Sequence, residues 1–138
     1  MRYPVRFVFG GWGADPALDA ERLRLSVEVL AAANEALFRR HPATPGVYES
    51  KVVYYRPEAA DEDDDFDDWA VVLERGYGDC EDLVAARIAE LRVRHGVAAR
   101  AGFDRRMVQT AEGPQERIHT WVLHPDGSRE DIARALGM

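Results

Sequence analysis

Apolar residues recur at helical spacing over much of the first two thirds of the chain, and the pattern becomes strand-like in the last third. Spacings of three and four residues predict helices, whereas alternation predicts strands. The predicted helices cover residues 16–40, 66–75 and 80–95. The predicted extended segments are 2–9, 47–55, 97–108 and 117–124, with a loop at 111–116 and a short return strand after residue 127. Helices followed by an antiparallel sheet predict an α+β fold.

The helices have recognisable apolar faces and ends. The expected buried stripe of the first helix is Leu23, Val27, Leu30, Ala33 and Leu37. In the short helix Trp69, Val72 and Leu73 should point inward, and in the next one Val84, Ile88 and Leu91 share a face with Cys80. Asp79 stands at an N-cap position, with Asp82 three residues later as in a capping box, and Gly96 is a natural helix end.

Length and composition place the chain among globular proteins. Its 138 residues, 46% of them apolar, fit one domain, residues 1–138, with its own core. No apolar run approaches the roughly 20 residues of a membrane span, and the N-terminus lacks the apolar stretch of a signal peptide. We therefore expect a cytoplasmic protein without a membrane association.

The charge is concentrated in one segment. Residues 61–68 hold seven acids, which equals the whole net charge of -7. An acidic balance without a basic stripe argues against a nucleic-acid partner. The segment is read first as a solvated loop, although it could also repel acidic substrates or dock a basic partner. Asp61, Asp63 and Asp65 are weak calcium candidates, because the glycine that an EF-hand loop needs is missing.

The single cysteine is the main chemical candidate. Cys80 follows a glycine-framed turn and an N-cap, where free N–H groups and the helix dipole favour a thiolate and can hold an oxyanion. Glu81 and Asp82 oppose this effect, so an imidazolium is needed beside the thiol. If the Trp121 face of its strand packs toward the helix, His119 is the histidine that meets Cys80. The sequence thus predicts Sγ within about 4 Å of the His119 ring and an activated thiol.

A third group should orient the imidazole. Pro125, Asp126 and Gly127 suit a three-residue hairpin turn with glycine at the left-handed position. That register pairs His124 with Ser128 and Trp121 with Asp131, so Asp131 shares the His119 face. Glu130 falls opposite Val122 and points away, and a two-residue turn would reverse the choice.

These residues resemble a known family. Gly78-Asp79-Cys80-Glu81-Asp82, then His119-Thr120-Trp121, then an acid after a hairpin, is similar to the transglutaminase-like superfamily of cysteine enzymes. The resemblance covers residues 76–131 and includes the helix at 16–40. The ending from Glu130 to Met138 is similar to that of short stand-alone members often encoded near phage-like genes. It implies a papain-like core with helices on a small antiparallel sheet. Ile132 follows Asp131, where the family usually has proline.

The resemblance also implies an activity. Cys80, His119 and Asp131 would form a triad for acyl transfer at an amide bond, as a cysteine protease, amidase or other hydrolase, or as a cross-linking acyltransferase. The Cys80 backbone N–H, with Tyr54 or Tyr55, would serve the oxyanion, supported by Asp79 and Trp121. No cofactor and no metal are expected, and the substrate would be a protein or peptide. The alternatives are a non-catalytic phage-related assembly protein, then virion-associated, and a calcium- or partner-binding module at the acidic loop.

Overall fold

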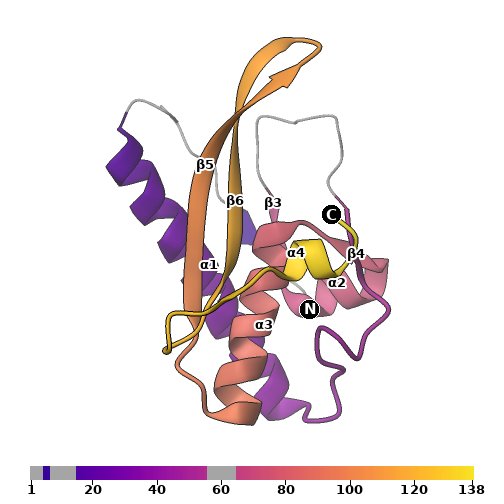
Figure 1. Cartoon of the computed structure of the whole chain (residues 1–138). Coiled ribbons are helices and arrows are strands. Elements are labelled where there is room, and N and C mark those ends of the chain that lie inside the picture. Colours follow the sequence, from indigo (N-terminus) through magenta and orange to yellow (C-terminus); the bar gives the residue numbers. More distant parts are fainter. Residues whose placement is uncertain (1–4, 7–14, 56–64) are drawn as a thin grey trace.

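The computed structural model describes residues 5–6, 15–55 and 65–138, and it has a mixed α+β fold (Figure 1). The predicted fold class is therefore confirmed at this level. The helices are α1 (Pro16–Arg40), α2 (Trp69–Arg75), α3 (Cys80–His95) and α4 (Ile132–Ala135). The strands are β1 (Val5–Arg6), β2 (Val53–Tyr54), β3 (Asp65–Phe66), β4 (Tyr77–Gly78), β5 (Arg100–Thr110), β6 (Gly113–Leu123) and β7 (Arg129–Glu130).

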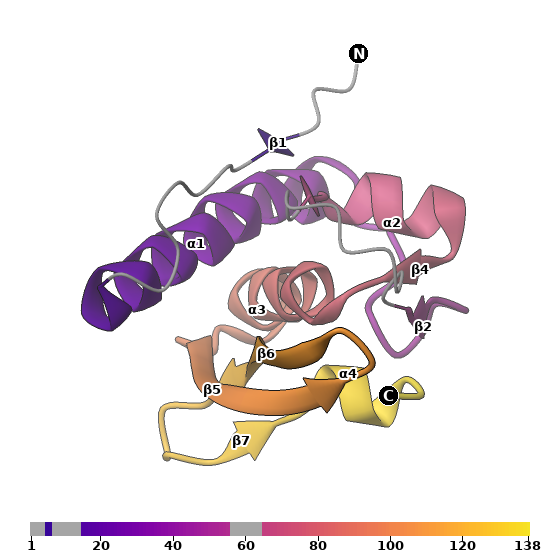
Figure 2. The same cartoon turned by 90° about the horizontal axis from the view of Figure 1, so that it is seen from above.

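Helix α3 lies between α1 and the β5–β6–β7 sheet (Figure 2). Its buried residues include Leu83, Val84 and Ile88, which have no exposed surface. Such central burial excludes water from the helix and stabilises it far more than helix propensity alone. The predicted inward residues Val84, Ile88 and Leu91 are confirmed. The first turn of α3 is thereby fixed against the sheet.

The predicted face of α1 is partly wrong. Leu23, Val27 and Leu30 are buried, but Ala33 is exposed and Leu37 is only half-buried. Two successive steps of three residues rotate Ala33 roughly 80° away from the direction of Leu23. Asn34 takes the buried position instead, and its Oδ1 accepts a hydrogen bond from the Trp69 backbone N–H at 2.8 Å. The buried face of α1 therefore includes a polar residue, Asn34, which a search for apolar spacing does not detect.

Helices α2 and α3 begin and end at local signals. Helix α2 starts at Trp69 rather than 66, because the Asp68 side chain caps it, and Trp69 and Val72 are buried as predicted. The capping box of Asp79 and Asp82 at the start of α3 is confirmed, as is the left-handed Gly96 at its end, with φ 62°. These short-range signals were sufficient to place both ends of α3.

Three small sheets complete the fold. Strands β5 and β6 form a long antiparallel hairpin that projects from the body (Figure 1), and β7 pairs with the other edge of β6. The predicted loop at 111–116 is wrong, because β6 begins at Gly113. Of the predicted segment 47–55, only Val53–Tyr54 is a strand, since residues 47–50 turn. Of the predicted strand 2–9, Val5–Arg6 is a strand, and the rest lies outside the described residues.

Trp121 packs closely over Gly102, its partner across the β5–β6 ladder. A Cβ atom at position 102 would lie 2.4 Å from the Trp121 Nε1 atom. We expect Gly102→Ala to lower the free energy of unfolding by about 1–3 kcal/mol and to change the tryptophan fluorescence. Gly76→Ala is the control, because its Cβ meets nothing within 4 Å and only the backbone at φ 86° is strained. An unchanged unfolding curve for Gly102→Ala would contradict the packing.

Candidate active site

The backbone before Cys80 is held on two sides. Strand β4 leads directly into α3 and pairs in parallel with β2, Tyr54 opposite Gly78. The Tyr55 backbone N–H donates to the Gly78 carbonyl at 3.0 Å. The Asp79 carboxylate then accepts from the Asp82 backbone N–H at 3.2 Å and closes the first turn. Cys80 is therefore the first residue of a helix whose N-terminus is fixed by two strands and a cap.

The Cys80 thiol lies against the backbone on both sides of His119. Its Sγ is 4.0 Å from the Ile118 carbonyl oxygen, and the Thr120 backbone also hydrogen-bonds the sulfur. These contacts place the thiol at the main chain of β6 around residue 119. The predicted distance from Sγ to the His119 ring stays a prediction.

The surroundings of Cys80 raise the pKa of its thiol. The side chain is only 6% exposed. This burial raises the pKa of Cys80 well above its usual value, and Glu81 and Asp79 raise it further, while the Thr120 backbone opposes them weakly. Burial and the two carboxylates therefore disfavour the thiolate form of Cys80.

The face of β6 that packs on the helices is also not the predicted one. Val122 belongs to the core, and Ile118 packs against it, whereas His119 and Trp121 occupy the opposite face. Trp121 is buried there over Gly102, with the Arg129 guanidinium 4.3 Å from its ring centroid. Both faces of this strand carry apolar residues, so alternation alone could not tell them apart.

The predicted hairpin register is confirmed. Val122 pairs with Glu130, the His124 backbone N–H donates to the Ser128 carbonyl at 2.9 Å, and Gly127 has φ 88°. His119 Nε2 is 2.7 Å from Asp131 Oδ2. Asp131, rather than Asp126 or Glu130, is therefore the acid that meets His119. Its other oxygen accepts from the Arg134 backbone N–H at 3.1 Å, which fixes the carboxylate as the cap of α4.

Glu130 has partners that the sequence did not reveal. Its carboxylate binds Tyr48 Oη at 2.7 Å, Arg87 Nε at 2.8 Å and His124 Nε2 at 2.8 Å. Burial raises the pKa of Glu130, but the hydrogen bonds from Tyr48, His124 and Arg87 prevail and lower it overall. Glu130 and Asp131, two successive residues of one hairpin, therefore each bind a histidine.

The remaining predicted site residues lie around this group. Tyr54 is half-buried against the core, and Tyr55 is exposed with its ring 5.2 Å from that of Tyr77. Trp121 lies 6.1 Å from His119 between ring centroids. Tyr54 and Tyr55 are thus close to the Cys80 helix through their backbones, and their role at an oxyanion stays a prediction.

The calcium hypothesis gains no support. Asp61 and Asp63 lie outside the described residues, and of Asp65 only the backbone, in β3, is described. Within residues 5–6, 15–55 and 65–138, no group of three or more acidic, histidine or cysteine side chains could hold a metal ion. Nor does any helix of these ranges have the length and apolarity to cross a membrane.

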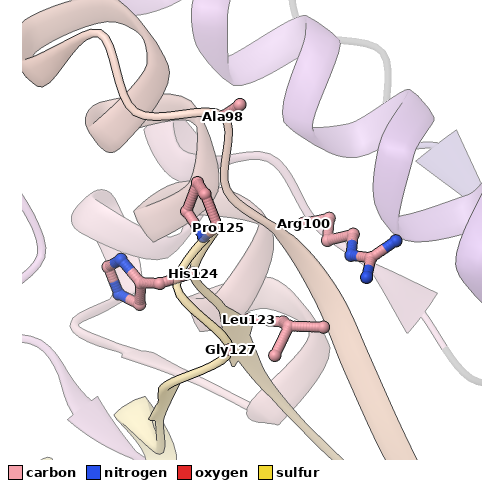
Figure 3. Close-up of a pocket in the computed structure, with 6 residues that line it drawn as sticks. All are labelled: Ala98, Arg100, Leu123, His124, Pro125 and Gly127. Atoms are coloured by element: carbon pink, nitrogen blue, oxygen red, sulfur yellow. The ribbon is translucent and has the colours of Figure 1, made fainter.

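A pocket that the sequence did not predict lies near the β6–β7 turn (Figure 3). It has a volume of about 290 Å³ and is lined by Ala98, Arg100, Leu123, His124, Pro125 and Gly127. The side chains of Arg100 and His124 point to opposite sides rather than converging (Figure 3). None of the three triad candidates lines it, so the pocket is separate from the candidate site.

No protein-family model, curated protein or solved structure matches the chain.

The raised pKa gives a direct expectation for alkylation. A neutral thiol reacts poorly with electrophiles. At pH 7, iodoacetamide should therefore modify Cys80 more slowly than it modifies the free thiol of N-acetylcysteine. The rate should rise only toward alkaline pH, where the thiolate forms. Mass spectrometry of the modified protein across a pH series measures this. A reaction faster than that of the free thiol at pH 6 would instead indicate a resting ion pair.

Proposed function

We propose that the protein is a cysteine-dependent acyl-transfer enzyme in which Cys80, His119 and Asp131 act as a triad. The proposal rests on the 2.7 Å contact between His119 Nε2 and Asp131 Oδ2, and on the position of Cys80 Sγ, 4.0 Å from the carbonyl oxygen of Ile118, the residue before His119. A papain-like or transglutaminase-like core belongs to this proposal. Its support is the helix α3, which begins at the cysteine, followed by an antiparallel sheet that carries the histidine in β6 and leads through β7 to the acid at the N-cap of α4.

The proposed mechanism gives each nitrogen of the imidazole one role. Nε2 faces Asp131, so Nε2–H donates to the carboxylate, and Nδ1 is the nitrogen left to accept the thiol proton. Asp131 keeps this tautomer and stabilises the imidazolium when it forms. In this proposal the proton leaves Sγ during attack rather than before it, because burial disfavours the free thiolate.

The reaction then follows from the geometry of an acyl transfer. Sγ attacks the carbonyl carbon, its proton passes to His119 Nδ1, and the backbone N–H of Cys80 donates to the oxyanion. The C–N bond breaks as His119 returns the proton to the leaving amine. Water or a second amine then attacks the thioester. We favour water, because a domain of this size has little structure to exclude it.

A chromogenic ester tests the acyl step. Incubation with p-nitrophenyl acetate should release a burst of about one nitrophenolate per protein and leave an acetyl group on Cys80, located by peptide mapping. Cys80→Ala should abolish the burst, and His119→Ala should slow it by about 10² or more. Acetylation spread over other residues, with no loss in Cys80→Ala, would contradict the proposal.

A second candidate is a binding or assembly protein that keeps the geometry without turnover. The burial of Cys80 is the observation that favours it, because a substrate carbonyl must reach the sulfur. A protein of this class would show neither the ester burst nor labelling of Cys80.

A further inference from the structure

Apolar side chains are exposed beside the start of α3. Val53, Tyr55 and Tyr77 are 52%, 51% and 37% exposed. Val53 and Tyr77 are opposite each other in the parallel β2–β4 pair and share a face, and the Tyr55 and Tyr77 rings meet edge to face at 5.2 Å. We call these three residues the tyrosine patch. Exposed, clustered aromatic residues of this kind mark binding surfaces.

The tyrosine patch is continuous with the backbone that carries the nucleophile. Tyr77 precedes Cys80 by three residues, and the Tyr55 backbone N–H binds the Gly78 carbonyl. Strand β4 runs straight into α3 (Figure 2). A chain lying across the patch would therefore reach the N-terminal end of α3 within a few residues.

The chain around β4 and the start of α3, residues 67–82, is strongly acidic. Residues 67–82 contain six acids, Asp67, Asp68, Glu74, Asp79, Glu81 and Asp82, and one basic residue, Arg75. Arg75 is already bound to the Asp67 and Asp82 carboxylates. Its guanidinium also lies 4.6 Å from the Tyr77 ring centroid, so this ring already binds one cation. The negative field reaches the sulfur, because Glu81 and Asp79 raise the pKa of Cys80.

We propose that the candidate site acts on a positively charged polypeptide segment, which seats an apolar or aromatic side chain on the tyrosine patch. The inference rests on the proposed acyl-transfer function. Charge complementarity selects the partner: the acidic segment attracts cationic residues and repels acidic chains and nucleic acids. The tyrosine patch provides the apolar contact for the bound segment, and the neighbouring carboxylates attract its positive charges.

Three peptidyl chloromethyl ketones of equal length test the charge. Each carries a phenylalanine, flanked by arginines, glutamines or glutamates. The second-order rate of Cys80 labelling should be about tenfold higher for the cationic than for the anionic probe at low salt, and the two rates should converge in 0.5 M NaCl. The intrinsic reactivity of the thiol affects both rates equally, so the ratio of the two rates reports only the effect of the probe's charge.

Variants then locate the effect. Glu81→Gln should lower the cationic-to-anionic ratio, whereas Glu112→Gln, a matched charge change at the distant β5–β6 turn, should not. Tyr77→Ala should slow the cationic probe severalfold, and Tyr77→Phe should restore it. Equal labelling by all three probes would overturn the inference and leave the proposed function standing. No labelling of Cys80 by any probe would overturn the proposed function and the inference together.

Discussion

Asp131→Asn should lower turnover by about 10³- to 10⁴-fold while the protein stays folded. The substitution keeps the shape of the side chain but removes the charge that stabilises the imidazolium. It also permits the amide to donate to His119 Nε2, which would favour the wrong tautomer and leave Nδ1 protonated. Asparagine is a good N-cap, so the start of α4 should persist. The ester reaction measures turnover, and thermal unfolding measures the fold.

Glu130→Gln is the matched control for this variant. From the sequence, Glu130 was expected to matter little, because it points away from His119. The structure gives it three partners, including the Arg87 guanidinium, so the variant should lose about 1–3 kcal/mol of stability. The folded fraction should keep most of its turnover. Equal losses of turnover in Asp131→Asn and Glu130→Gln would contradict the assignment of Asp131 as the orienting acid.

Arg75→Met should destabilise the protein by about 3 kcal/mol. Asp82 is 1% exposed, and its carboxylate binds Arg75 at 3.0 Å and the Asp67 backbone N–H at 2.8 Å. Burial raises the pKa of Asp82 well above its usual value, Asp79 raises it further, and Arg75 opposes both effects. Removing Arg75 therefore leaves a buried carboxylate without its cation. Chemical denaturation measures the loss.

Arg24→Met provides the surface comparison, because Arg24 and its partner Glu21 are both exposed. Its effect on stability should be much smaller, since solvent screens such pairs. If the two variants unfold at the same denaturant concentration, the ion pair of Arg75 does not stabilise the start of α3.

The sequence predicted the features that depend on neighbouring residues. The cap at Asp79, the end at Gly96 and the turn at Gly127 each follow from local backbone chemistry. The register that brings Asp131 to His119 then follows from the turn and the alternation of side chains. These predictions succeeded because each needed only a few residues of one segment.

Features set by distant contacts were not predicted. Buried Asn34 depends on the α2 backbone, which supplies its hydrogen bond. The face of β6 that packs inward is chosen by α3, since both faces are partly apolar. The raised pKa of the Cys80 thiol depends on how deeply the fold buries it. Burial and long-range partners of this kind cannot be read from one segment.

In the proposed mechanism Cys80 is a nucleophile whose proton is taken by His119. Its most direct test is the rate at which a peptidyl electrophile labels Cys80 in the wild-type protein and in His119→Ala, with the site identified by mass spectrometry. We expect stoichiometric labelling of Cys80 at pH 7 in the wild type and a labelling rate lower by about 10² or more in the variant. Equal rates in the two proteins, or no labelling of Cys80, would contradict it.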